Sequence, residues 1–233
     1  MWEPQLKLAE HGWRVIAPHF RGFDEPADGH PANHPTVDDY AGHVVDLLDS
    51  LHVTEAVFCG LSMGGYVLFA LLRHAARYVQ GVVLADTRPQ ADTPEGVEAR
   101  KRMLTIAAEK GAPGVADEMV PKLLGETTRR EEPDVAERVR SLILSNDATA
   151  IANAVNVLMT RPDSTPLLAS IHIPAMIVVG EEDTLTPPAL SQDMQRAVAG
   201  ADLAIIAGAG HLSNIEQPEA FNAVVARFLE QRL

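Results

Sequence analysis

A serine, an aspartate and a histidine that lie far apart in the chain have the residue types and surroundings required for nucleophilic catalysis. Ser62 lies in Gly60-Leu61-Ser62-Met63-Gly64, a G-x-S-x-G pattern between a strand-like run and a helix-like run. This pattern is typical of a nucleophile elbow, a tight turn that lifts the serine hydroxyl above the edge of a sheet. We expect Gly60 and Gly64 to give the turn its space, because a Cβ there would crowd the backbone. The helix that begins here favours negative charge at its first N–H groups.

A serine hydroxyl is a weak nucleophile by itself, so it requires a base and an acid that orients the base. In this motif the acid follows the serine in the chain and the histidine comes last. Asp183 in GEEDTLTPP and His211 in GAGHLSNIEQP satisfy this order, and each follows a strand-like run, where α/β active sites gather. Asp86, at the end of GVVLAD, is the alternative acid, but Asp183 is favoured over it. Glu181 and Glu182 are expected to be solvated.

These residues require a scaffold in which strands and helices alternate, which predicts an α/β fold. Short apolar runs without polar alternation predict the strands of a parallel sheet that is covered on both faces. The predicted strands are 13–18, 56–61, 81–86, 175–180 and 201–208. Helical spacing of apolar residues predicts helices over 40–51, 66–76, 189–198 and 218–231. Thr36 and Asp39 form a capping-box-like start for the first of these helices.

Residues 88–170 interrupt this alternation with consecutive helical patterns that proline and glycine separate. Helices are predicted over 94–109, 113–124, 134–144 and 149–159. We therefore expect an α/β core of residues 1–87 and 171–233, with residues 88–170 inserted as a helical lid.

The composition limits the class of protein further. With 19 basic and 32 acidic residues the formal net charge is −13, so the chain lacks the positive surface that binds nucleic acid or anionic membranes. The single cysteine, Cys59, excludes an intramolecular disulfide and is expected to be buried. The chain begins without the pattern of a signal peptide. These observations predict a cytoplasmic protein without membrane spans, and they leave its oligomeric state open.

Five segments that span nearly the whole chain resemble the α/β-hydrolase superfamily, in its branch of small carboxylesterases, enol-lactonases and C–C bond hydrolases. They are RVIAPHFRGF, GLSMGGYV, VVLADT, GEEDTLTPP and GAGHLSNIEQPEAF. The resemblance implies the α/β-hydrolase fold, with Ser62 as nucleophile, His211 as general base and acid, and Asp183 as orienting acid. It also implies the backbone N–H of Met63 as an oxyanion donor, a helical lid over the acyl pocket, and no cofactor or metal. The expected reaction is cleavage of a small carboxylic ester or lactone through an acyl-enzyme on Ser62.

The sequence departs from the family pattern in two places. His19 stands where family members usually carry an aspartate, and we expect it to have a structural or surface role. Family members also begin with a hairpin and a strand ending in His-Gly, whose loop supplies a second oxyanion N–H. His11-Gly12 precedes the run at 13–18 instead of following a strand, so Gly12 is expected to end a helix. The chain thus resembles a family member that lacks its N-terminal strands.

In this family the missing strand lies between the runs at 13–18 and 56–61. Either these two runs pair directly, or another chain fills the space, or Met1 is an internal methionine of a longer protein, which is the alternative we expect. The function has alternatives as well: a C–C bond hydrolase or perhydrolase with the same three residues, or a catalytically impaired or non-catalytic protein of this fold. Dehalogenase and epoxide hydrolase chemistry is disfavoured, because those relatives carry aspartate at the elbow.

Overall fold

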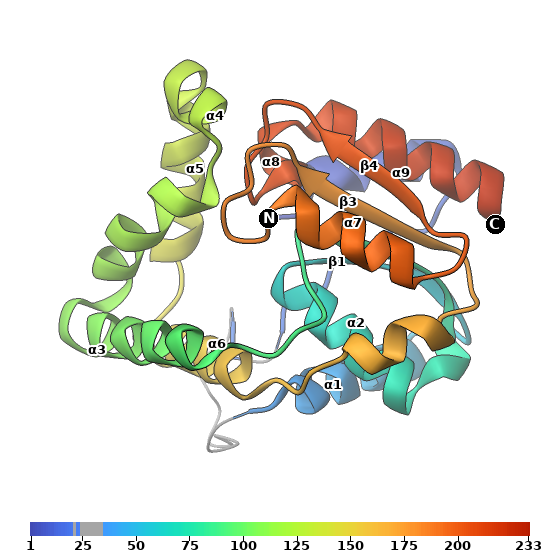
Figure 1. The fold of residues 1–233 in the computed structure, drawn as a ribbon, viewed down its shortest axis with the longest axis horizontal. Coiled ribbons are helices and arrows are strands. Elements are labelled where there is room, and N and C mark those ends of the chain that lie inside the picture. Colours follow the sequence, from blue (N-terminus) through green and yellow to red (C-terminus); the bar gives the residue numbers. More distant parts are fainter. Residues whose placement is uncertain (21, 24–34) are drawn as a thin grey trace.

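A four-stranded parallel sheet forms the centre of the computed structural model, which describes residues 1–20, 22–23 and 35–233 (Figure 1). The strands are β1 (Ala56–Leu61), β2 (Val79–Ala85), β3 (Ala175–Gly180) and β4 (Asp202–Ile206), in the spatial order β1-β2-β3-β4. Each neighbouring pair is parallel. Four of the five predicted strands are confirmed, and because the strands are parallel, the loops that follow them meet at one edge of the sheet.

The predicted strand at residues 13–18 is wrong. This segment forms no ladder, and among the described residues β1 pairs only with β2. A strand requires a hydrogen-bonded neighbour, whereas here Val15, Ile16, Val57 and Cys59 all line one cavity of about 400 Å³. The two runs therefore do not pair directly. Cys59, which was expected to be buried, is exposed in this cavity.

Both faces of the sheet are covered by helices, as predicted. Along β2 the side chains alternate, so that Val82 and Leu84 face one core and Val83 and Ala85 face the other. The first core is closed by α1 (Val37–Ser50), α2 (Met63–His74) and α7 (Pro188–Ala197). The second core is closed by α8 (Ser213–Glu216), α9 (Pro218–Arg232) and the 3-10 helix η1 (Glu3–His11).

Two predicted helix ends follow from their local sequence. The Oγ1 atom of Thr36 accepts the N–H of Asp39 at 3.2 Å, and the carboxylate of Asp39 accepts the N–H of Thr36 at 2.7 Å. This is the predicted capping box at the start of α1. Gly12 ends η1 in the left-handed conformation, with φ 86°, and donates its N–H to the carbonyl of Ala9 at 3.0 Å.

Most of residues 88–170, here called the helical segment, lies beside the sheet edge (Figure 1), but the end of the segment packs on one face, where Leu168 joins the first core. Its elements are α3 (Pro94–Leu123), α4 (Glu126–Glu131), α5 (Pro133–Leu144), α6 (Ala148–Thr160) and the 3-10 helix η3 (Thr165–Ser170). Gly111 has φ 63° and breaks α3, which confirms the predicted interruption between 109 and 113. The short helix α4 was not predicted. The two ends of the segment meet, because the N–H of Ser164 donates to the carbonyl of Pro89 at 2.8 Å.

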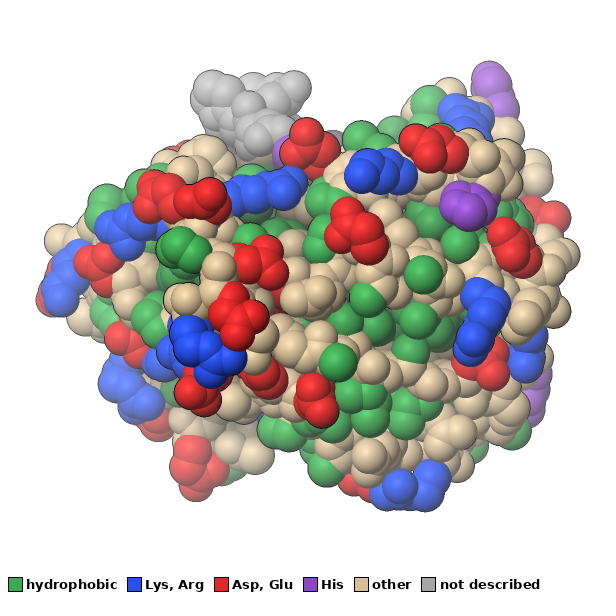
Figure 2. All heavy atoms as spheres, turned by 90° about the horizontal axis from the view of Figure 1, so that it is seen from above, with side chains coloured by type: hydrophobic (Ala, Val, Ile, Leu, Met, Phe, Trp, Pro, Cys, Tyr) green, Lys and Arg blue, Asp and Glu red, His purple; other side chains and the backbone are tan. Residues whose placement is uncertain are grey.

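Surface charge and helix hydropathy agree with the composition. Seen from above, basic side chains are interspersed with acidic ones, so the described residues on this face form no continuous positive surface (Figure 2). Within the described parts of the chain, no single helix has the length and hydropathy to cross a bilayer. The pair α5 and α6 reaches that length only when taken together, with a bend of 98° between them.

Candidate active site

The turn between β1 and α2 presents Ser62 at the sheet edge. Ser62 has φ 52° and ψ −110°, a conformation that a residue with a side chain adopts rarely and that commonly marks functional sites. Its N–H donates to the carbonyl of Ala85 at 2.8 Å, and its own carbonyl accepts the hydroxyl of Thr87 at 2.8 Å and the N–H of Gly65 at 3.0 Å. These hydrogen bonds on both sides hold the turn in its strained form.

The glycines of the turn differ in what they do. A Cβ on Gly60 would lie 2.5 Å from the backbone of Gly64, so the predicted requirement for glycine holds at Gly60. At Gly64 the expectation is wrong, because a Cβ there would meet nothing within 4 Å. The second close approach belongs to Gly65, where a Cβ would lie 2.5 Å from Oγ1 of Thr87. The G-x-S-x-G motif does not predict this contact, because Gly65 lies one residue beyond the motif and Thr87 lies in the loop after β2.

The structure brings the three predicted residues into one chain of hydrogen bonds. The Oγ atom of Ser62 lies 2.9 Å from Nε2 of His211, and Nδ1 of His211 lies 2.8 Å from Oδ2 of Asp183. Both Asp183 and His211 are buried, with only 3% and 4% of their surfaces exposed. The three residues follow β1, β3 and β4, so the parallel sheet sets their spacing.

Asp183 is held as a carboxylate. Burial alone would raise the pKa of Asp183, but hydrogen bonds from His211 and Thr186 and the charge of His211 hold this pKa below its ordinary value. An ionised Asp183 can only accept, so Nδ1 of His211 donates to it, and this hydrogen bond orients the ring with Nε2 toward the hydroxyl of Ser62.

A threonine that was not predicted supports the acid. Thr186 donates its hydroxyl to Oδ2 of Asp183 at 2.5 Å, and the N–H groups of Leu185 and Thr186 donate to Oδ1 at 2.8 and 3.0 Å. Backbone donation two residues after an aspartate is typical of an Asx turn, so the D-T-L-T sequence carries a signal for this arrangement.

Asp86, the alternative acid, has other partners. Its Oδ1 accepts the N–H of Gly180 at 2.8 Å, and its Oδ2 accepts the hydroxyl of Ser213. Complete burial raises the pKa of Asp86 to about 7. Asp86 thus joins the ends of β2 and β3 to the start of α8, and Asp183 is the carboxylate at Nδ1 of His211.

The remaining predicted residues surround this chain. Met63 is the first residue of α2, so its N–H has no acceptor inside the helix and lies next to Ser62. Glu181 and His19 are exposed, as expected. The expectation for Glu182 is wrong: its carboxylate accepts the N–H and the hydroxyl of Thr127 at 2.8 and 2.5 Å. These hydrogen bonds hold the pKa of Glu182 below its ordinary value.

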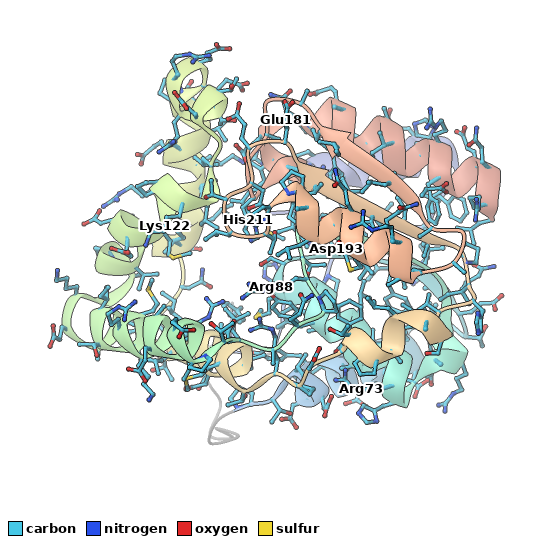
Figure 3. All side chains as sticks on the ribbon, in the orientation of Figure 1. Arg73, Arg88, Lys122, Glu181, Asp193 and His211 are labelled. Carbon is cyan, nitrogen blue, oxygen red and sulfur yellow. The ribbon has the colours of Figure 1, made fainter. Side chains whose placement is uncertain are left out.

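The surroundings of the site are the helical segment and the ends of the strands. His211 lies on the side of the sheet that faces the helical segment (Figure 3). Within residues 1–20, 22–23 and 35–233, no group of three or more histidine, cysteine, aspartate or glutamate residues is arranged to hold a metal ion.

Comparison with known proteins shows the family to which the chain belongs. The family model described as "Alpha/beta hydrolase family" matches residues 1–224, so the chain belongs to the alpha/beta hydrolase family. The chain is similar to 3-oxoadipate enol-lactonase 2 from Acinetobacter baylyi, with 28% identity over 98% of this chain and 84% of the relative. These findings confirm the predicted fold class.

Solved structures agree with this assignment. A thermophilic esterase from Thermogutta terrifontis, solved with malate bound, matches 99% of this chain and 84% of its own chain, with TM-score 0.93 and 35% identity. The enol-lactonase from Burkholderia xenovorans LB400 matches 99% of this chain and 86% of its own, with TM-score 0.88 and 29% identity. With relatives of these two kinds, the chain is a carboxylesterase-like hydrolase.

Proposed function

We propose that the protein hydrolyses a small carboxylic ester or lactone through an acyl-enzyme on Ser62. The observation that carries this proposal is the unbroken set of hydrogen bonds from Ser62 through His211 to Asp183. The strained turn presents the half-buried Ser62 at the sheet edge, and the adjacent helix start supplies the N–H groups that such a reaction requires. The esterase and enol-lactonase relatives support the same substrate class.

Each proton transfer in the proposed reaction has a named donor and acceptor. Ser62 attacks the substrate carbonyl through Oγ while Nε2 of His211 takes its proton, and Asp183 stabilises the resulting imidazolium. The N–H of Met63 donates to the oxyanion of the tetrahedral intermediate. His211 then returns the proton to the leaving alkoxide, which departs as an alcohol from an ester or stays attached to the acyl group of a lactone. Finally His211 takes a proton from water, whose oxygen attacks the carbonyl carbon of the acyl-enzyme. The bond from that carbon to Oγ of Ser62 then breaks, His211 returns the proton to Oγ, and the acid is released.

The helical segment has a role in this proposal as a lid. Residues 1–87 and 171–233 form the core that holds the reacting groups, and residues 88–170 cover them and shape the acyl pocket. The position of His211 facing the helical segment supports this division (Figure 3).

The test uses an activated short-chain ester and a fluorophosphonate probe. The expected result is a burst of product equal to the amount of enzyme, followed by steady turnover, with the probe attached to Ser62 by mass spectrometry. Ser62→Ala abolishes both, whereas Ser50→Ala, at an exposed position in α1, keeps both. Absence of a burst together with an unlabelled Ser62 would refute the proposal.

The alternatives with the same three residues are tested on the same preparation. Cleavage of a β-diketone tests C–C bond hydrolysis, and formation of peracid from acetate and hydrogen peroxide tests perhydrolysis. Turnover of either substrate with a higher kcat/KM than any ester or lactone would replace the proposed substrate class while leaving the role of Ser62 unchanged.

A further inference from the structure

A buried glutamate that the proposed reaction does not use accepts hydrogen bonds from the residues on both sides of His211. Glu216 is only 1% exposed, and its Oε1 accepts the N–H of Gly210 at 2.9 Å and that of Leu212 at 3.1 Å. Gly210 and Leu212 are the residues directly before and after His211. The other carboxylate oxygen, Oε2, accepts the N–H of Gly125 at 2.7 Å. Gly125 is the residue before α4 in the helical segment.

The same stretch of the helical segment touches the histidine loop directly. The N–H of His211 donates to the carbonyl of Leu123 at 3.1 Å. A Cβ on Gly210 would lie 2.2 Å from the backbone nitrogen of Gly125. The two backbones therefore pack against each other without an intervening side chain, and Glu216 accepts hydrogen bonds from both of them.

We propose that Glu216 is a positioning residue, which holds His211 at the correct distance from Ser62 by fastening both flanks of His211 to Gly125. The inference rests on the proposed function, because it concerns the geometry of that reaction. Hydrogen bonds to an ionised acceptor are roughly twice as strong as those between neutral groups. Three of them on one buried carboxylate fix the loop more firmly than backbone contacts alone.

The loop that carries the acid is fastened to the same stretch of chain. Glu182 precedes Asp183 directly and accepts the N–H and hydroxyl of Thr127. Residues 123–127 are thus joined through Glu216 to the two residues that flank His211, and through Glu182 to the residue before Asp183. A displacement of this stretch moves both His211 and Asp183 relative to Ser62.

Two substitutions at Glu216 separate its contacts. A glutamine keeps one carbonyl oxygen, which retains two hydrogen bonds if it faces Gly210 and Leu212, and its NH₂ group then opposes the N–H of Gly125. Glu216→Gln therefore breaks the link to the helical segment, whereas Glu216→Ala removes all three bonds. The matched control is Glu219→Gln, at an exposed position in the first turn of α9.

The measurement is kcat and KM for an activated ester, with the rate divided by the concentration of Ser62 titrated in the burst. Misplacement of a reacting group by 1 Å can lower a rate about 10²-fold. We expect kcat to fall about 10²-fold in Glu216→Ala and by a smaller factor in Glu216→Gln, with KM changing less than kcat. The rate of Ser62 labelling by the fluorophosphonate falls by a similar factor, and Glu219→Gln matches the wild type.

The outcomes separate this inference from the proposed function. Because rates are divided by titrated Ser62, a variant that only lowers the amount of folded protein keeps the wild-type kcat, and this result would overturn the positioning role. A loss confined to KM would overturn it too. If the wild-type enzyme shows no burst and no labelling of Ser62, the proposed function fails instead.

Discussion

Replacing Gly65 by alanine is expected to disturb the elbow more than the same replacement at Gly64, although only Gly64 belongs to the G-x-S-x-G motif. A Cβ at Gly65 would lie 2.5, 2.6 and 2.8 Å from Oγ1, Cγ2 and Cβ of Thr87. Favourable contacts between carbon atoms lie at about 3.5–4.0 Å. Thr87 is completely buried and donates to the carbonyl of Ser62, so it cannot move away without breaking that bond.

The size of the effect follows from these contacts. Overpacking a close-packed interior costs about 1–3 kcal/mol, and loss of the Thr87 hydrogen bond adds about 1 kcal/mol. Alanine in place of glycine inside a helix contributes a gain of up to about 1 kcal/mol. Gly65→Ala should therefore lower the free energy of unfolding by about 1–4 kcal/mol. Gly64→Ala, whose Cβ enters open space, should leave it unchanged or raise it by up to about 1 kcal/mol.

Urea unfolding of both variants and of the wild type measures this difference. Activity gives a second readout, because Thr87 and Gly65 both hydrogen-bond the carbonyl of Ser62. A shift of Ser62 by about 1 Å would lower kcat about 10²-fold in Gly65→Ala. Equal unfolding free energies for the two variants, with wild-type kcat in Gly65→Ala, would refute the reasoning.

Three further predictions concern the buried carboxylates. Because burial raises the pKa of Asp86 to about 7, above its value of about 3.9 in an unfolded chain, the contribution of Asp86 to the free energy of unfolding falls between about pH 4 and pH 7. Asp86→Asn should remove this pH dependence. The test is urea unfolding of the variant and the wild type at pH 5 and pH 8; a difference in unfolding free energy between the two proteins that is equal at both pH values would contradict the prediction. The pKa of Asp183 is lowered, so its carboxylate contributes stability above about pH 4 that is lost as the pH falls through the folded-state pKa; Asp183→Asn should be less stable at pH 7, with a gap that narrows in acid. Thr186→Val removes a hydrogen bond to Asp183 and should raise the pKa of that carboxyl, which moves the midpoint of acid unfolding to higher pH; an unchanged midpoint argues against it.

The sequence predicted the central sheet and the three hydrogen-bonded residues because both depend on local pattern. Ser62 comes directly after an apolar run, and Asp183 and His211 lie in the loops that follow two others. The capping box at Thr36 and the glycine at Gly12 are equally local, since each is satisfied within four residues.

The features that escaped prediction depend on partners far along the chain. The run at 13–18 has the composition of a strand, but a strand exists only where a neighbour pairs with it. Glycine is required at position 65 because a side chain there would collide with Thr87, which follows the next strand, β2. A glutamate is usually solvated, yet Glu182 accepts from Thr127, 55 positions away, and Glu216 accepts from Gly125, 91 positions away, as well as from Gly210 and Leu212 nearby.

The bond between Ser62 and His211 has a consequence for refolding, since it joins residues 149 positions apart. Contacts of such large sequence separation form slowly, because the intervening chain must first be ordered. A polypeptide that ends before β4 contains the serine but not the histidine, so it has no base for the nucleophile. Recovery of hydrolytic activity after dilution from urea should therefore lag behind the recovery of helical circular dichroism, and it reports the arrival of the last strand at the sheet.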